Sequence, residues 1–255
     1  NSFKLDENFL LGVASAATQI EGGDVNSNWN DWYKKGRIKD GSDPARANDH
    51  YNRFREDIDL MAKMGIEIYR FGIEWARIEP EDGLFDEDVL SHYREEVLLL
   101  RKRGISPLLT LHHFNNPMWF ENFGGFESPD APEIFLRYVK KVICVLGDIV
   151  SEYITINEPN VYATMSYFYG TWPPGKKSFS SVRKVFKNFT FCHAKSYELI
   201  HKTRREMGFT DTKVSFANHI RIFEPACRFN PWHIICAKLM EILFQGGITK
   251  SMSLG

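Results

Sequence analysis

The sequence has no excess of charge of either sign and no long apolar run. Its 32 Lys and Arg are balanced by 33 Asp and Glu over 255 residues. A basic surface that would attract nucleic acid is therefore not indicated. No apolar stretch approaches the roughly 18 residues of a membrane-spanning helix, and the first residues carry no hydrophobic signal region. We therefore expect no nucleic-acid partner and no membrane span.

Paired cysteines are missing as well. The chain has four cysteines and no Cys-x-x-Cys pair: Cys144, Cys192, Cys227 and Cys236. We expect reduced thiols in or near the core of an intracellular protein, which predicts a cytoplasmic location. His112 and His113 are adjacent, but consecutive strand residues point to opposite faces, so they do not suggest one metal ion. With no cysteine or carboxylate at ligand spacing, we expect no metal and no cofactor.

Aromatic residues, in contrast, are abundant. Twenty Phe, ten Tyr and six Trp make up 14% of the chain, and several stand beside polar motif residues. Sugar rings have apolar C–H faces that stack on flat aromatic surfaces, so this mixture suits a carbohydrate pocket. A large aromatic core accounts for the composition equally well.

Strand-like segments alternate with helix-like segments along the chain. Strands are predicted at residues 9–16, 66–72, 105–112, 153–157 and 213–218, and helices at 46–63, 88–103, 132–146, 161–169, 181–207 and 232–244. This alternation, without repeats or linkers, predicts an α/β fold with a parallel sheet, in one domain over residues 1–255. The length suits a complete (β/α)8 barrel of the TIM type, but the strand count predicts a barrel truncated after about the fifth strand.

One strand end carries the most informative motif, Thr155-Ile156-Asn157-Glu158-Pro159. The carboxyl ends of the strands are where an α/β barrel keeps its reacting groups. Asn157 can hydrogen-bond a hydroxyl, and Glu158 can donate and retake a proton. Pro159 lacks an N–H and ends the strand. The alternative is an ordinary turn with a solvated glutamate.

This pentapeptide resembles the acid/base signature of family 1 of the glycoside hydrolases, the β-glucosidase group. Three further segments resemble motifs of that family in the same order: residues 16–23 (Ala-Ala-Thr-Gln-Ile-Glu-Gly-Gly), 69–80 (Tyr-Arg-Phe-Gly-Ile-Glu-Trp-Ala-Arg-Ile-Glu-Pro) and 111–117 (Leu-His-His-Phe-Asn-Asn-Pro). The resemblance covers nearly the whole chain and weakens after about residue 160. It implies that the chain corresponds to the N-terminal portion of the family's barrel.

The resemblance implies a role for five residues. Glu158 would be the acid/base that protonates the leaving oxygen, and Asn157 would hold the sugar 2-hydroxyl. Arg70 would lie beneath the site and pair with the nucleophilic carboxylate, which keeps that carboxylate ionised. Gln19 would bind two hydroxyls of the sugar, and His113 would bind the 3-hydroxyl.

The sequence departs from the family pattern at two positions and lacks one motif. Gly72 stands where Ser is usual, and Phe114 stands where most members carry Trp, which leaves the preferred sugar hydroxyl open. The Thr-Glu-Asn-Gly motif of the family's nucleophile does not occur in the sequence. We therefore expect the nucleophile in a C-terminal part absent from this chain. Three other glutamates fit structural roles better than that of a nucleophile: Glu21, Glu74 and Glu224.

The predicted activity is that of a retaining β-glycosidase acting on terminal β-D-glucosyl residues, with galactosyl and fucosyl residues as close alternatives. The substrate would be a β-glucoside or an oligosaccharide. A 6-phospho-β-glycosidase is the nearest alternative enzyme. Outside this class, the chain could be a catalytically incomplete sugar-binding half-site or an interaction fragment. An unclosed barrel has two sheet edges, which can pair with a complementary C-terminal chain or with another copy.

Overall fold

The structure is a computed structural model that describes residues 6, 8–23 and 26–254. Within these residues lies a parallel sheet of five strands in the order β1-β2-β3-β4-β5. The strands span Gly12–Ala14 (β1), Ile68–Gly72 (β2), Ser106–His112 (β3), Glu152–Asn157 (β4) and Lys213–Ala217 (β5). Because each neighbouring pair is parallel, the carboxyl ends of all five strands lie together at one end of the sheet, which is called the carboxyl edge below. The predicted truncated barrel is confirmed.

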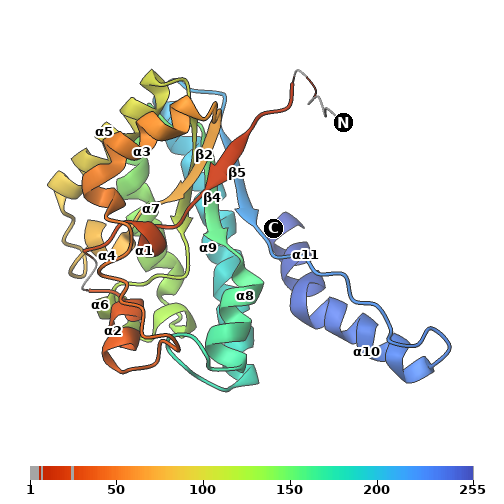
Figure 1. The fold of residues 1–255 in the computed structure, drawn as a ribbon. Coiled ribbons are helices and arrows are strands. Elements are labelled where there is room, and N and C mark those ends of the chain that lie inside the picture. The colour runs from red at the N-terminus through yellow and green to blue at the C-terminus, as the bar shows by residue number, and fades with distance from the viewer. Residues whose placement is uncertain (1–5, 7, 24–25, 255) are drawn as a thin grey trace.

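Long helices connect successive strands and cover one face of the sheet (Figure 1). They are α3 (His50–Lys63), α5 (Glu87–Lys102), α7 (Ala131–Leu146) and α9 (Phe179–Glu206). Apolar residues at helical spacing face inward, as Phe54 and Ile58 of α3 do, both fully buried. Helix α5 begins where the Asp86 side chain accepts hydrogen bonds from two backbone N–H groups.

Four short helices near the carboxyl ends of the first three strands were not predicted, whereas the one predicted at 161–169 corresponds to α8 and η2 below. Helices α1 (Ala17–Ile20) and α2 (Asn28–Lys34) lie in a segment that reads as a polar loop, and α4 (Trp75–Ile78) and α6 (Met118–Asn122) follow β2 and β3. Helices of one or two turns are stabilised by tertiary contacts rather than by periodic sequence patterns. The first strand is also shorter than residues 9–16, and α3 begins at His50 instead of residue 46 because Asp49 has a left-handed φ of 60°.

The remaining short elements are η1 (Gly125–Glu127), α8 (Pro159–Ala163) and the π-helical turn η2 (Thr164–Phe168). After β5, the chain forms α10 (Pro231–Glu241), the π-helical turn η3 (Ile242–Gly246) and α11 (Gly247–Leu254). Figure 1 shows α10 projecting away from the helical layer, and none of its residues is buried. In the described part of the chain, no helix has both the length and the apolar character needed to cross a bilayer.

The core beneath the strand ends is a cluster of aromatic rings around Trp75 of α4. The ring centroid of Trp75 lies 4.8 Å from that of Phe120, 5.7 Å from that of Phe135 and 4.9 Å from that of Tyr138. All four side chains are buried. Burying rings of this size contributes about 1.5–3 kcal/mol each, so the segment that follows β2 is firmly held.

The expected positions of the cysteines were only partly correct. Cys192 on α9 is buried, whereas Cys144, Cys227 and Cys236 are exposed, and all four are free thiols. Cys144 lies on α7, whose apolar stripe faces the sheet without it, and Cys236 lies on α10, where nothing is buried. Helical periodicity alone therefore did not place these side chains in the core.

Candidate active site

The predicted site residues gather at the carboxyl edge of the sheet. Arg70 lies on β2, His113 directly follows β3, and Asn157 ends β4. Gln19 lies on α1, just after β1. The structure brings Arg70, Asn157 and His113 into contact and places Gln19 in a cavity with His113. Glu158 follows Asn157, but its side chain does not line that cavity.

A row of hydrogen bonds joins the first three of these residues. The Arg70 guanidinium donates from Nη2 to Oδ1 of Asn157 and from Nε to Oγ1 of Thr110, at 3.1 Å. Because Oδ1 of Asn157 accepts from Arg70, its Nδ2 is the atom that lies 3.1 Å from Nε2 of His113 and donates to it. The row therefore fixes the orientation of the Asn157 amide.

The same hydrogen bonds and the surrounding burial determine the tautomer and the charge of the His113 ring. Its Nε2 accepts a hydrogen bond, so the ring proton of the neutral imidazole is on Nδ1. Burial lowers the pKa of His113 to about 3, with smaller contributions from the positive charge of Arg70 and from His112. His113 is therefore an uncharged group near neutral pH, suited to hydrogen bonding rather than to charge pairing.

Gln19 and His113 line a cavity of about 240 Å³ with aromatic walls formed by Trp29, Phe114 and Trp172. The Trp172 ring centroid lies 5.6 Å from that of Trp29 and 4.9 Å from that of Phe114. The Trp29 indole N–H donates to the Phe114 carbonyl at 3.2 Å, which ties the walls together. A concave site with flat apolar walls and few polar groups suits a sugar ring.

Sequence reasoning did not assign Trp29 or Trp172 to the site. Both lie in polar, Gly- or Pro-rich segments, and only the high aromatic content hinted at such a wall. Their approach to Phe114 depends on loops that are distant in sequence, so no local motif reveals it.

Glu158 has an unusual backbone conformation and a partly open environment. Its φ of 43° and ψ of 59° lie in the left-handed region, which non-glycine residues adopt rarely. The backbone N–H of Glu158 donates to the Ala217 carbonyl of β5 at 2.6 Å. Its side chain is 31% exposed, and it is directed toward the segment that follows β5.

That segment supplies two contacts that the sequence did not predict. Oε1 of Glu158 lies 3.2 Å from Nδ1 of His219, and the Arg221 Nε–H donates to Nε2 of His219 at 3.0 Å. Because Nε2 of His219 accepts, the proton of the neutral ring is on Nδ1 and is donated to Glu158. A signal was present: His219 directly follows a predicted strand, as His113 does.

The glutamates named as weaker nucleophile candidates are engaged elsewhere. Glu21 accepts a hydrogen bond from Tyr93 and pairs with Arg77 at 3.4 Å. Glu74 accepts hydrogen bonds from the side chain of Thr18 and from a backbone N–H. Glu224 is exposed. The structural roles expected for Glu21 and Glu74 agree with these contacts.

His112, the last residue of β3, and His113, which follows it, lie in different environments, as expected for consecutive residues of extended backbone. His112 is fully buried among aromatic rings, donates from Nε2 to Asn116 at 2.9 Å, and has its pKa lowered to about 4 by burial. Among the residues that the structure describes, no group of three or more His, Cys, Asp or Glu is arranged to hold a metal ion.

Comparison with known proteins gives a consistent result. The model of the family described as glycosyl hydrolase family 1 matches residues 1–254. Beta-glucosidase A of Thermotoga maritima is 33% identical over 233 residues, which are 89% of this chain and 51% of the relative. The chain thus spans about half the length of the curated relatives it matches.

Solved structures show the same partial coverage. The beta-glycosidase from Pyrococcus horikoshii has a TM-score of 0.87 and 35% identity, covering 97% of this chain and 56% of that one. Beta-glucosidase from Thermotoga maritima in complex with glucoimidazole has a TM-score of 0.89 and 31% identity, covering 94% and 55% of the two chains.

Proposed function

The chain belongs to glycosyl hydrolase family 1, and from that premise we propose that it forms the acid/base half of a retaining β-glycosidase. The proposed substrate is a β-glucoside or oligosaccharide with a terminal β-D-glucosyl residue, and galactosyl and fucosyl residues are next in preference. The complex of the Thermotoga maritima relative with glucoimidazole supports a sugar-like ligand for this fold.

The proposed reaction has two steps. Glu158 donates its proton to the glycosidic oxygen as the bond from that oxygen to C1 breaks, while a nucleophilic carboxylate bonds to C1 from the other side. Glu158, now a carboxylate, then takes a proton from a water molecule whose oxygen displaces the nucleophile from C1. The second carboxylate is a glutamate outside residues 1–255, held about 5–5.5 Å from Glu158 as retaining enzymes require.

The observation that carries the proposal is the row Arg70–Asn157–His113 beside an aromatic cavity. In the proposed complex, Asn157 binds the 2-hydroxyl, and this bond strengthens as positive charge develops on the ring in the transition state. His113 and Gln19 bind the more distant hydroxyls. Arg70 orients Asn157 and faces the incoming nucleophile.

The open sheet edges support the partner in this proposal. Within the described residues, β1 and β5 each pair with one neighbour only, and unpaired edges readily accept another strand. We propose a complementary C-terminal half of the barrel as the occupant, with self-association as the competing outcome. The four free cysteines support a reducing compartment such as the cytoplasm.

An aryl β-glucoside assay tests the catalytic part. The purified chain is assayed alone and with a separately expressed C-terminal half of a family 1 β-glucosidase, with Glu158→Gln as the control. We expect turnover only in the mixture and its loss in Glu158→Gln. An assembled mixture without turnover, or turnover that Glu158→Gln leaves intact, would overturn the proposal.

The recognition part is tested without chemistry, by titrating the chain with glucoimidazole in a calorimeter. We expect saturable binding to one site. No binding at millimolar concentrations of the inhibitor would show that these residues alone do not form a sugar site.

A further inference from the structure

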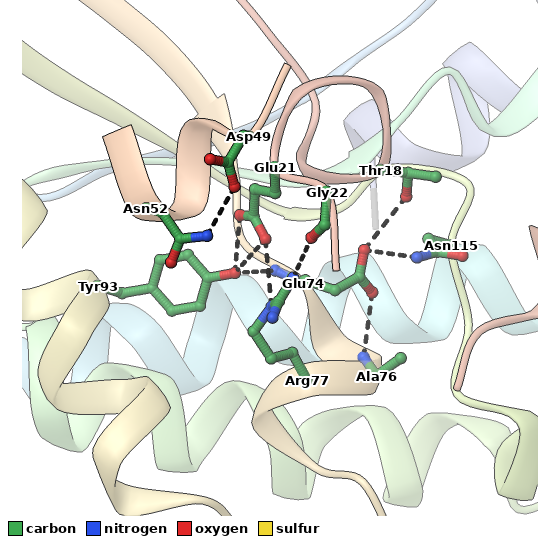
Figure 2. A network of polar contacts seen from close by, with 10 residues as sticks. All are labelled: Thr18, Glu21, Gly22, Asp49, Asn52, Glu74, Ala76, Arg77, Tyr93 and Asn115. Atoms are coloured by element: carbon green, nitrogen blue, oxygen red, sulfur yellow. Dashed lines mark hydrogen bonds and ion pairs between the residues drawn. The ribbon is translucent and has the colours of Figure 1, made fainter. Parts of the chain in front are cut away.

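One buried carboxylate joins the two segments that carry Gln19 and His113. Glu74 follows β2, and its side chain is almost completely buried, with 1% of the residue exposed. Figure 2 shows the side chains of Thr18 and Asn115 both directed toward its carboxylate. Thr18 immediately precedes Gln19, and Asn115 follows His113 by two positions.

The contacts of Glu74 divide between its two oxygens. Oε1 accepts from the backbone N–H of Ala76 at 3.1 Å, which caps α4. Oε2 accepts from Oγ1 of Thr18 at 3.2 Å and from Nδ2 of Asn115. These groups all act as donors toward Glu74, which matches a carboxylate and not an amide.

A second carboxylate holds the other side of Gln19. The Glu74 backbone N–H donates to the Tyr93 hydroxyl at 2.9 Å, and that hydroxyl donates to Oε1 of Glu21 at 2.8 Å (Figure 2). Arg77 donates to the Gly22 carbonyl at 2.6 Å. The residues before and after Gln19 are therefore both held by the segment that follows β2.

We propose that Glu74 is a positioning residue that sets the separation of Gln19 and His113, and through it the sugar affinity of the cavity between them. This inference rests on the proposed function, because it assigns a purpose to the same cavity. Glu74 does not line the cavity itself. It acts through Thr18 on one side and Asn115 on the other.

The decisive experiment exchanges donor and acceptor. Glu74→Gln replaces Oε2 with an NH2 group that faces the NH2 group of Asn115, so the link to Asn115 is lost in the observed amide orientation, while the Thr18 hydroxyl can accept from the new amide. In the double variant Glu74→Gln/Asn115→Asp, the new amide donates to the new carboxylate and to the Thr18 hydroxyl, while its oxygen still accepts from Ala76. The pattern of hydrogen bonds is restored with the same total charge.

Glu79→Gln is the matched control. Glu79 is equally buried, lies five residues further along, and bonds to Trp75, Gly83 and Arg137. None of these partners lines the cavity. Glu79→Gln therefore removes a buried carboxylate from the same part of the fold without changing a hydrogen bond to the segments that carry Gln19 and His113.

Two readouts separate this inference from the proposed function. The first is the Kd for glucoimidazole. We expect it to rise roughly 10- to 100-fold in Glu74→Gln, to return to within about threefold of the parent value in the double variant, and to stay unchanged in Glu79→Gln. The second is the NMR signals of the Gln19 side-chain amide and the His113 ring in the chain without ligand.

The outcomes are distinct. If the parent chain does not bind glucoimidazole, the proposed function fails, and the NMR signals still decide whether Glu74 positions the two residues. If the parent binds and Glu74→Gln binds equally well, the inference is wrong. It is also wrong if the double variant behaves like Glu74→Gln, or if Glu79→Gln weakens binding as much.

Discussion

At the carboxyl edge of the sheet, the β1–β3 side and the β4–β5 side are built differently. On the first side, Glu21 and Glu74 are buried and bonded to several partners. On the second side, Glu158 and His219 are about one-third exposed, and they contact each other and Arg221. The residues proposed to bind the sugar can thus be held in place by this chain alone. The environment of Glu158, the proposed acid/base, depends instead on what covers its side chain.

The largest expected effect lies on the open side. In the assembled enzyme, Glu158→Gln should lower kcat/KM for glycosides with poor leaving groups by about 10²- to 10⁴-fold, because these substrates need a proton from the acid. Activated aryl glycosides should lose less, since their leaving groups depart without protonation. Steady-state kinetics on a matched pair of substrates measures the difference. Equal losses on both substrates would argue against the acid/base role.

The buried side should instead control the pH dependence of stability. Burial raises the pKa of Glu21 from 4.5 to about 7, opposed by the nearby Arg77. Between these values the folded chain retains a proton that the unfolded chain releases, so the free energy of unfolding falls as pH rises through this window. The loss from Glu21 is at most about 3 kcal/mol.

Urea unfolding of the parent and of Glu21→Gln at pH 4.5, 5.5 and 7.5 isolates this contribution. Other groups titrate in both proteins, including His50, whose pKa is raised to about 9 by hydrogen bonds to Glu96 and Asp57 that outweigh its burial. The free energy of unfolding of the parent, relative to that of Glu21→Gln, should fall as pH rises from 4.5 to 7.5. A difference that does not change with pH would contradict the raised pKa.

A smaller effect, on the affinity for glucoimidazole, is expected for His113→Ala. The substitution removes a neutral hydrogen-bonding ring from the cavity, so the Kd for glucoimidazole should rise by about 10-fold. The melting temperature should change little, because only the contact with Asn157 and neighbouring rings is lost. A large fall in the melting temperature would identify His113 as a core residue instead.

The smallest effect is expected for His219→Ala. The ring is partly exposed, and its contacts with Glu158 and Arg221 are open to solvent screening, so the free energy of unfolding should change by less than about 1 kcal/mol. Urea unfolding at neutral pH measures it. A loss above about 2 kcal/mol would mean that the open side is packed as firmly as the buried one, and the contrast between the sides would fail.

The strands were predicted from local patterns, whereas the site residues at their carboxyl ends were assigned by the resemblance to the family's motifs. Apolar runs mark the five strands, and Arg70, His113 and Asn157 come together since parallel strands end at one edge. The role of Glu74 was not predictable. Its partners Thr18 and Asn115 lie 56 and 41 positions away, and only the folded chain brings them together.

The contact between Glu158 and His219 shows a different limit. The two residues are 61 positions apart, but each follows a strand, and β4 and β5 are neighbours. His219 directly follows the predicted fifth strand, residues 213–218, so examining the residue after that predicted strand would have named it. Of the last two helices, α10 was predicted as part of residues 232–244, whereas α11 was not, although its buried residues Ile248 and Met252 are four positions apart.

The left-handed backbone of Glu158 has an evolutionary consequence. A non-glycine residue in this region raises the free energy of the folded state by about 1–3 kcal/mol, and glycine or asparagine adopts it more easily. A lineage selected for thermal robustness alone would gain by discarding the glutamate. Under the proposed acid/base role, a lineage selected for glycoside cleavage retains the glutamate and, with it, the higher free energy of the folded state.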